Sequence, residues 1–183
     1  MQAWQRIEPT EVTKAGWQTI TTKTFLKPNG EKAVFSTVYP DGQQFAGIIG
    51  LTPDNQVIVA RQFRAGAEQV MDEIVGGFID GDETPEQAAK RELMEETGYE
   101  TGSMTYLGMV HKDAYLNAKW HFFLARDCVR VTTEQELSLN EHIDIELVSI
   151  NEFINNAKND KMTDHAAVLL AYDELQSIKN GGK

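Results

Sequence analysis

The chain has 183 residues, of which 41% are hydrophobic and 25% are charged, and its formal net charge is −11. This length suits one domain, or a core domain with a small appendage, and the hydrophobic content is sufficient for a folded core. The excess of acidic residues argues against a nucleic-acid-binding surface, because proteins bind phosphate backbones through Lys and Arg.

The N-terminus and the single cysteine bear on the cellular compartment. Residues 1–7 lack the apolar run of a signal peptide, and no segment has the apolar length of a transmembrane helix. Cys128 has no second cysteine to pair with, and its apolar surroundings predict a buried thiol. We therefore expect a cytoplasmic protein that does not associate with membranes.

Residues 17–63 are predicted to form several strands separated by turns. The strands are expected at 33–39, 44–51 and 56–60, and the turn signals lie at 28–30, 40–42 and 53–55. Another short strand is expected at 70–75. Trp17, Phe35 and Tyr39 are expected to pack in the core, with stacking on a base as the alternative.

A helix is predicted between Thr84 and Gly98. Thr84 and Gln87 have the spacing of a capping box, and Pro85 suits the first helical position. Gly98 is a natural C-terminal stop.

Three carboxylates, those of Glu92, Glu95 and Glu96, share one turn of this helix. Like charges at this spacing repel each other and weaken an isolated helix. A cation would neutralise them, and Mg²⁺ prefers carboxylate oxygens. The alternative is a solvated acidic face. Ala88 and Ala89, one turn earlier, are expected to leave room for a ligand on the same face.

The remainder of the chain completes an α/β pattern. Strands are expected at 104–110, 120–125 and 146–148, and a short helix at 149–157. A longer helix at 163–178 has an apolar stripe that comprises Ala166, Ala167, Leu169, Leu170, Leu175 and Ile178. Many strands with few helices predict a layered α/β domain around a mixed sheet.

Residues 77–99 resemble the Nudix box, Gly-x5-Glu-x7-Arg-Glu-U-x-Glu-Glu-x-Gly-U, in which U is a bulky apolar residue. The matching residues are Gly77, Glu83, Arg91, Glu92, Leu93, Glu95, Glu96 and Gly98. Tyr99 stands at the last position, where an aliphatic residue is usual. Residues 61–64 and 73–77 resemble the Gln-x-Arg and Glu-x-x-x-Gly elements of the ADP-ribose and nucleotide-sugar branch of the Nudix hydrolases.

The resemblance implies the Nudix fold, an α/β/α sandwich around a mixed sheet. Residues 1–44 would form an antiparallel N-terminal strand extension, and residues 45–183 would form the hydrolase domain. In the ADP-ribose pyrophosphatase branch such an extension is often exchanged between two subunits, so a homodimer is expected.

The resemblance also implies an activity, the divalent-metal-dependent hydrolysis of a nucleoside diphosphate linked to another moiety. Glu92 and Glu96 would bind Mg²⁺ or Mn²⁺ directly, Glu95 would assist, and the Gly76 carbonyl would complete the metal's ligands. Arg91 would orient and pair a carboxylate in the catalytic machinery. Glu83 would support the loop.

Residues outside the box would complete the site. Arg64 is the first candidate for binding the diphosphate and Arg61 is the second, because arginine forms charge-assisted hydrogen bonds with phosphate oxygens. Glu73 would bind substrate or pin a loop. Glu141, in the segment 137–144, is the candidate general base or a further metal ligand, with an exposed loop glutamate as the alternative.

One departure concerns the substrate. Many ADP-ribose pyrophosphatases have a proline-containing loop past the box, whereas residues 111–120 contain no proline. GDP- or UDP-linked hexoses therefore compete with ADP-ribose as expected substrates. Lys112, Tyr115 and Asn117 could line the terminal-sugar end or form a solvated loop.

Two other functions stay open at this point. One is a nucleoside triphosphate or dinucleotide pyrophosphatase. The other is a non-catalytic nucleotide-binding module, which is disfavoured because such modules usually lack box glutamates and this chain keeps them.

Overall fold

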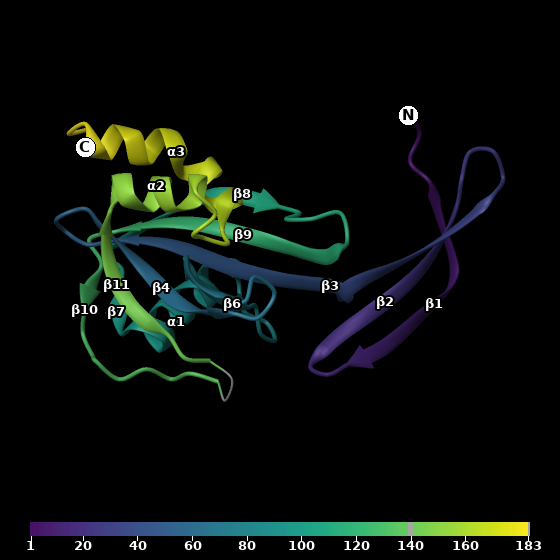
Figure 1. Cartoon of the computed structure of the whole chain (residues 1–183), viewed down its shortest axis with the longest axis horizontal. Coiled ribbons are helices and arrows are strands. Elements are labelled where there is room, and N and C mark those ends of the chain that lie inside the picture. Colours follow the sequence, from purple (N-terminus) through teal and green to yellow (C-terminus); the bar gives the residue numbers. More distant parts are fainter. Residues whose placement is uncertain (139–140, 183) are drawn as a thin grey trace. The chain divides into compact units, whose positions relative to one another are not determined.

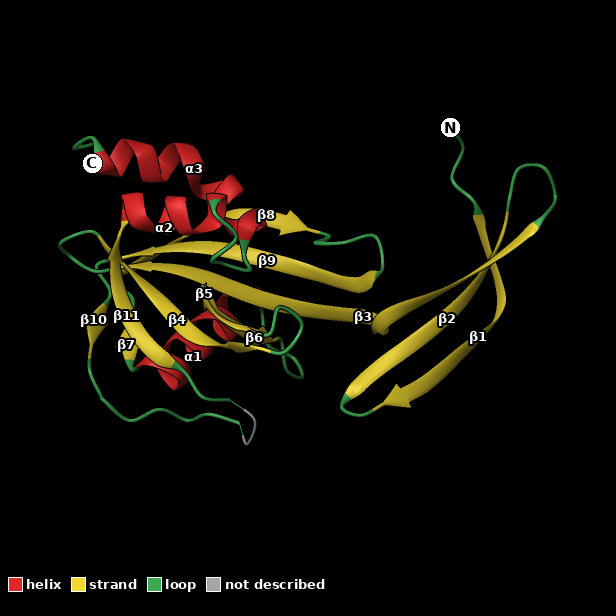
Figure 2. Cartoon of the chain, in the orientation of Figure 1, coloured by secondary structure: helices red, strands yellow, loops and turns green. Residues whose placement is uncertain are grey.

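The computed structural model describes residues 1–138 and 141–182, except for the side chains of residues 8 and 9. The chain forms two compact units. Unit 1 comprises Met1–Gln44 with His111–Trp120, and unit 2 comprises Phe45–Val110 with His121–Lys183. Figures 1 and 2 show the elements of both.

Unit 1 is built on an antiparallel sheet. Strand β1 (Gln5–Ala15) pairs with β2 (Gln18–Leu26), and β2 pairs with the first part of β3 (Lys32–Leu51). β1 precedes the region in which strands were predicted. Trp17, in the turn between β1 and β2, is 71% exposed, so its expected place in a core is wrong. Phe35 instead packs in an aromatic cluster with Trp4, Phe25 and Tyr115.

Strand β3 runs without interruption through residues 40–42, where a turn was predicted. Tyr39 and Gly42 have φ angles of 77° and 82°, so the turn-type backbone is present as an irregularity within the strand. The Tyr39 carbonyl accepts hydrogen bonds from Thr21 Oγ1 at 2.8 Å and Asn117 Nδ2 at 3.3 Å. These two bonds hold the irregular backbone in place, and the chain therefore continues as one strand.

In unit 2 the end of β3 pairs with β4 (Gln56–Arg64) and with β6 (Val75–Phe78). β4 also pairs with β5 (Gln69–Glu73) and with β11 (Asp144–Ser149). β9 (Leu116–Arg126) pairs with β3 and β8 (Ser103–Val110), and β7 (Tyr99–Glu100) pairs with β10 (Val129–Arg130). The single strand predicted at 70–75 is therefore two strands, β5 and β6, with different partners.

Three helices complete unit 2: α1 (Pro85–Thr97), α2 (Ile150–Lys158) and α3 (His165–Lys179). Helix α1 covers one face of the curled, mixed sheet, and α2 with α3 covers the other (Figure 1). The predicted α/β/α layering is thus confirmed. Within the described residues, no helix is both long and apolar enough to span a bilayer.

The inner surface of α1 is fully packed. Ala88, Ala89 and Leu93 are buried in one core cluster with Ile48, Ile58 and other sheet residues. The expectation that the two alanines leave room for a ligand is therefore wrong. Their small side chains instead allow the helix backbone to lie close to the sheet. This sets the distance between the sheet and the carboxylates further along α1.

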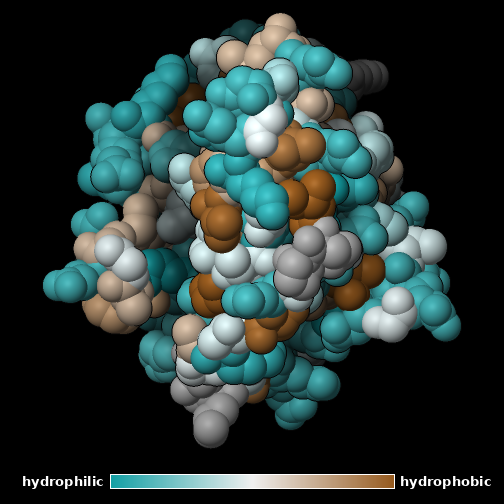
Figure 3. Space-filling model, turned by 90° about the vertical axis from the view of Figure 1, so that its right-hand side faces the viewer, coloured by the Kyte–Doolittle hydropathy of each residue, from teal (hydrophilic) through white to brown (hydrophobic). Residues whose placement is uncertain are grey.

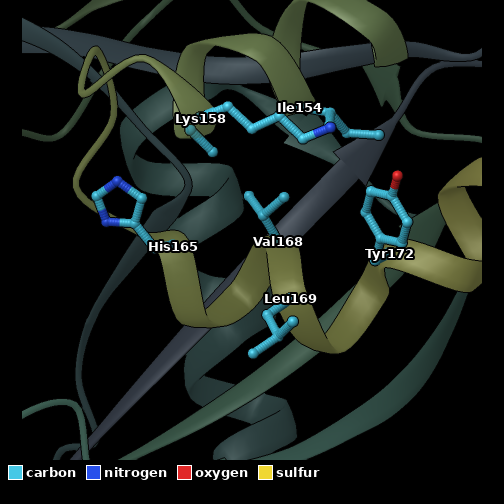
Figure 4. A pocket seen from close by; sticks show the side chains of 7 residues that line it. Ile154, Lys158, His165, Val168, Leu169 and Tyr172 are labelled. Atoms are coloured by element: carbon cyan, nitrogen blue, oxygen red, sulfur yellow. The ribbon is translucent and has the colours of Figure 1, made fainter.

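The apolar stripe predicted for α3 is confirmed in part. Ala167, Leu175 and Ile178 are buried as predicted, together with Val168 and Ala171, whereas Leu169 is 78% exposed and Leu170 is also exposed. A groove of about 300 Å³ lies between α2 and α3, with Val168, Leu169 and Tyr172 on one side (Figure 4).

On the surface drawn in Figure 3, hydrophobic residues are scattered among hydrophilic ones.

Candidate active site

A cavity of about 300 Å³ in unit 2 is lined mainly by acidic side chains. Its walls come from β6, the loop after β6, the last two turns of α1 and the segment before β11. The lining residues are Gly76, Gly77, Phe78, Asp80, Arg91, Glu92, Glu95, Glu96, Glu136, Ser138 and Glu141. The structure thus brings every predicted metal ligand together with Arg91 and Glu141.

Local signals in the sequence position the carboxylates of α1. Thr84 caps the helix, and the Gln87 side chain accepts from the Thr84 N–H at 2.8 Å, which completes the predicted capping box. Gly98 adopts the left-handed conformation with φ 71°, and its N–H donates to the Met94 carbonyl. These two ends set the register of α1, and therefore the direction of its three glutamates.

Glu96 lies at the back of the cavity and is only 8% exposed. Burial and the charges of Glu92 and Glu141 raise the pKa of Glu96 to about 9, against a hydrogen bond from the Gly76 backbone. Burial also raises the pKa of Glu92, although Arg91 opposes this rise. Three carboxylates therefore converge on a poorly solvated space.

Arg91 binds four groups around the mouth of the cavity. Its Nε and Nη2 donate to the two Glu83 oxygens at 2.8 and 3.0 Å, and Nη1 donates to Glu92 at 2.8 Å and Glu95 at 2.9 Å. Nη2 also donates to the Phe78 carbonyl at 2.9 Å. Arg91 therefore joins the start of the box to its glutamate-rich end, and Glu83 lies in the supporting position that was expected.

The two glycines of β6 are needed for different reasons. A Cβ on Gly77 would collide with the Glu92 carboxylate, whereas a Cβ on Gly76 would collide with the Ala46 carbonyl of β3. Gly77 thus lets a carboxylate approach the backbone, and Gly76 lets two strands approach each other.

The segment before β11 is fastened to the end of α1. The Gln135 side chain donates to the Glu96 carbonyl at 2.6 Å, and the Glu136 N–H donates to the Glu95 carbonyl at 2.8 Å. Sequence reasoning missed both residues. The available signal was general, since the last carbonyls of a helix need donors from elsewhere.

Glu141 reaches the cavity from this segment, and its carboxylate accepts from the Ser138 N–H at 2.8 Å. Residues 139 and 140 of the segment lie outside the described part of the chain.

The three substrate-binding candidates lie on β4 and β5. Arg64 donates through Nε and Nη2 to both oxygens of Glu73, whose side chain is buried. Arg61 instead donates through Nε to Asp72 at 2.8 Å and lies 3.6 Å from Glu146. The two arginines therefore have different settings. Roles for Arg61, Arg64 and Glu73 in substrate binding stay predictions.

The donor set of the cavity fits a hard divalent cation, because it offers carboxylate oxygens whose negative charge is poorly solvated. Among residues 1–138 and 141–182, however, no three His, Cys, Asp or Glu side chains form a ready group of metal ligands. Arg91 holds Glu92 and Glu95 by hydrogen bonds to its guanidinium.

A family model described as the NUDIX domain matches residues 43–171, which is well over half of the chain. The chain belongs to the Nudix family. The box helix, the acidic cavity and the layered fold are the features that carry this assignment in the structure.

Named proteins are similar to this chain over most of its length. The ADP-ribose pyrophosphatase of Bacillus subtilis (strain 168) is 26% identical over 158 residues, which cover 85% of this chain and 84% of that protein. The methanol dehydrogenase activator of Bacillus methanolicus is 26% identical over 151 residues, with 81% and 80% covered. A crystal structure of an ADP compounds hydrolase superposes with a TM-score of 0.79 at 20% identity, covering 97% of this chain and 96% of that one, which shows the fold.

Residues 111–120, which include the start of β9, belong to unit 1, whereas the acidic cavity lies in unit 2. Asn117 holds unit 1 together: it accepts from Lys23 Nζ at 2.5 Å and donates to Asp41 at 2.9 Å. Tyr115 packs beside Phe35, and the Lys112 ammonium lies 5.5 Å from the centre of the Trp120 ring. Each of the three residues therefore has a structural contact, and a role at the sugar end of a substrate stays a prediction.

Proposed function

We propose that this Nudix pyrophosphatase hydrolyses nucleoside diphosphate sugars to a nucleoside monophosphate and a sugar phosphate, with ADP-ribose and other ADP-linked sugars as the first candidates. One observation carries the proposal: Glu96 is buried at the back of a cavity that Glu92 and Glu141 also face. Such a site is complementary to a cation that accompanies a diphosphate.

Glu92, Glu95 and Glu96, with the Gly76 carbonyl, would hold a Mg²⁺ or Mn²⁺ ion. When bound, such an ion neutralises charge on the diphosphate and lowers the pKa of a water molecule. Arg91 keeps Glu92 and Glu95 together at the mouth of the cavity and supplies the positive charge that lets them lie side by side.

Glu141 would act as the general base. It faces the same space as Glu92 and Glu96 but belongs to a different segment, so it can take a proton without being a box ligand. Arg64 would bind a diphosphate oxygen, since its guanidinium is partly exposed and the buried Glu73 fixes its orientation.

The names of the relatives favour ADP-linked substrates. Two are an ADP-ribose pyrophosphatase and, in the mouse, an ADP-sugar pyrophosphatase that is 32% identical over 97 residues, covering 48% of this chain. The missing proline at 111–120 argues in the other direction, so GDP- and UDP-hexoses belong in the same test.

A hydrolysis screen with Mg²⁺ or Mn²⁺ tests the proposal. It would compare ADP-ribose, ADP-, GDP- and UDP-hexoses and dinucleotides, with alkaline phosphatase added to release phosphate from the products. Nucleoside triphosphates, which alkaline phosphatase cleaves by itself, would be tested without it, by chromatography of the nucleoside monophosphate formed. We expect the fastest release from an ADP-linked sugar. Cleavage of triphosphates alone would overturn the sugar assignment.

The matched variant for this screen is Glu96→Gln, which replaces the carboxyl group by an amide that cannot ionise and keeps the shape of the side chain. We expect at least a 100-fold loss of kcat on the best substrate. Wild-type turnover in Glu96→Gln would show that the metal assignment is wrong.

A further inference from the structure

Asp164 stands at the N-cap of α3, yet within the described structure its side chain makes no capping hydrogen bond to the helix. Asp at this position normally accepts from the second or third N–H of the helix. Here the carboxylate is buried, at 6% exposure, and its Oδ2 accepts from the Ile74 N–H at 3.2 Å. The same Oδ2 also accepts from Thr163 Oγ1 at 3.3 Å, so the side chain binds both the sheet and the residue before the helix cap.

Ile74 is the point at which the chain passes from β5 to β6. Glu73, just before it, pairs with Ala60 of β4, and Val75, just after it, pairs with Ile48 of β3. Ile74 therefore joins two strands that are held by different neighbours. The bond from its N–H to Asp164 fastens this junction.

The two sides of Ile74 have separate tasks in the site. Glu73 holds the guanidinium of Arg64, and Gly76 supplies the backbone hydrogen bond to Glu96. β6 itself has little freedom, because a Cβ at Gly76 would already collide with β3. A change at the junction would therefore displace the Glu73 side relative to the fixed Glu96 side.

The segment before α3 is tightly anchored beside β5. The Asp72 N–H donates to the Lys161 carbonyl at 2.9 Å, the Thr163 N–H donates to the Asp72 carbonyl at 3.3 Å, and Met162 forms a parallel bridge with Asp72. Asn156 of α2 donates to the Asp72 carboxylate at 2.8 Å. These bonds hold the segment 161–163 against β5 and thereby place Asp164 beside Ile74.

We propose that Asp164 is a positioning residue that fixes Arg64 relative to Glu96 by holding the junction at Ile74. Asp164 touches neither substrate nor metal in this role. It acts through the backbone at Ile74 and through Glu73, and its charge also acts directly on Arg64. The inference rests on the proposed function for what Arg64 binds, but its structural part can be tested without any substrate.

The experiment compares Asp164→Ala with Asp164→Asn. The alanine variant removes the acceptor for the Ile74 N–H, whereas asparagine keeps an oxygen that can accept the same bond. We expect Asp164→Ala to lower kcat/KM at least tenfold, mainly through KM, on the best nucleoside diphosphate sugar of the screen. Asp164→Asn should remain within about threefold of wild type, since a neutral acceptor replaces a charged one.

The matched control is Ala166→Gly in the first turn of α3. It weakens the helix through lower helix propensity and leaves the Ile74 bond intact. We expect a lower Tm in Ala166→Gly with unchanged KM. An equal rise of KM in Ala166→Gly and Asp164→Ala would show that general loosening of α3 is the cause, and this would overturn the proposal.

A second readout uses NMR on the metal-free protein. In Asp164→Ala the Ile74 amide should exchange with solvent at least tenfold faster. The Arg64 Nε–H resonance should shift further than in Asp164→Asn, which loses the same charge but keeps an acceptor for the Ile74 N–H. Wild-type values for both signals would overturn the proposal, as would faster exchange with an unchanged KM. If wild type cleaves no nucleoside diphosphate sugar, the proposed function fails, and these two signals still decide whether Asp164 positions Arg64.

Discussion

Arg64 and Glu73 face each other across β4 and β5, and the guanidinium donates through two nitrogens to both carboxylate oxygens. The arginine is partly exposed, whereas the glutamate is buried. A buried carboxylate that holds one edge of a guanidinium fixes the direction of the other edge. The pair thus presents a preoriented cation without metal or substrate.

Arg64→Ala should raise KM for the best substrate about 10- to 100-fold, because it removes charge-assisted hydrogen bonds that are each worth about 1.5–3 kcal/mol. Arg64→Lys should restore little, since an ammonium cannot reproduce the paired geometry of a guanidinium. Steady-state kinetics at saturating Mg²⁺ would measure both.

Arg61→Ala is the control for that prediction. Arg61 binds Asp72 and lies near Glu146, so its loss should lower Tm and leave KM nearly unchanged. If KM rises more in Arg61→Ala than in Arg64→Ala, then Arg61 binds the diphosphate and Arg64 has the structural role.

Glu141→Gln should lower kcat about 100-fold or more, the range expected for loss of a general base. Glu136→Gln is the matched variant, because Glu136 lines the same cavity and its hydrogen bond to α1 comes from the backbone N–H. It should retain wild-type kcat within a few fold.

Mn²⁺ affinity, measured by calorimetry, separates the two alternatives for Glu141. A base leaves the affinity unchanged on substitution, whereas a metal ligand weakens it. An undiminished kcat in Glu141→Gln would remove this residue from the mechanism.

Gly77→Ala and Gly76→Ala should fail in different ways. At Gly77 the new methyl group meets the Glu92 side chain, which can move, so we expect a large loss of activity with a small change in stability. At Gly76 it meets the backbone of β3, and overpacking of this kind costs about 1–3 kcal/mol. Urea unfolding and kinetics on the same samples would distinguish them; equal stability losses would contradict the assignment.

Asp41 gives unit 1 a pH dependence. Hydrogen bonds from Arg6 and Asn117, followed by Lys23, hold the pKa of the Asp41 carboxyl well below its usual range. A lowered pKa in the folded state stabilises the fold above the unfolded pKa of about 3.9, and this stabilisation is lost as the pH falls through the folded value.

Asp41→Asn should therefore reduce the free energy of unfolding by about 1 kcal/mol at pH 7, since the carboxylate is half-exposed and its pairs are screened. The difference from wild type should shrink below about pH 4. Hydrogen exchange of peptides from β1 and β2 would measure this. Glu11→Gln, on exposed β1, is the control; a difference from wild type that does not vary with pH would contradict the role of Asp41.

The parts of the site that the sequence predicted are those governed by local rules. Thr84, Gln87 and Gly98 define the ends of α1 through contacts within a few residues, so its glutamates were correctly placed on one helix. The Nudix spacing then identified the family. The turn predicted at residues 40–42 was wrong because Asn117, distant in sequence, stabilises an irregular backbone at Tyr39 within strand β3.

Other features depend on which partner an element meets. Periodicity shows that α3 is amphipathic, but Leu169 is exposed because α2 covers only part of the apolar stripe. Asp164 has the sequence signature of a helix cap, and only the fold shows that its carboxylate is used by Ile74. The spacing of residues in the sequence reveals neither the exposure of Leu169 nor the partner of the Asp164 carboxylate.

Unit 1 is assembled from two distant parts of the chain, and this bears on the order of events during synthesis. The Val38 N–H donates to the Tyr115 carbonyl, and Asn117 contacts Lys23 and Asp41. At about 5–20 residues per second, β1 and β2 leave the ribosome several seconds before these partners exist. The hairpin of β1 and β2 is therefore made several seconds before its partners at residues 115–117, so a fragment ending at residue 44 should be prone to aggregate, whereas the full chain should not.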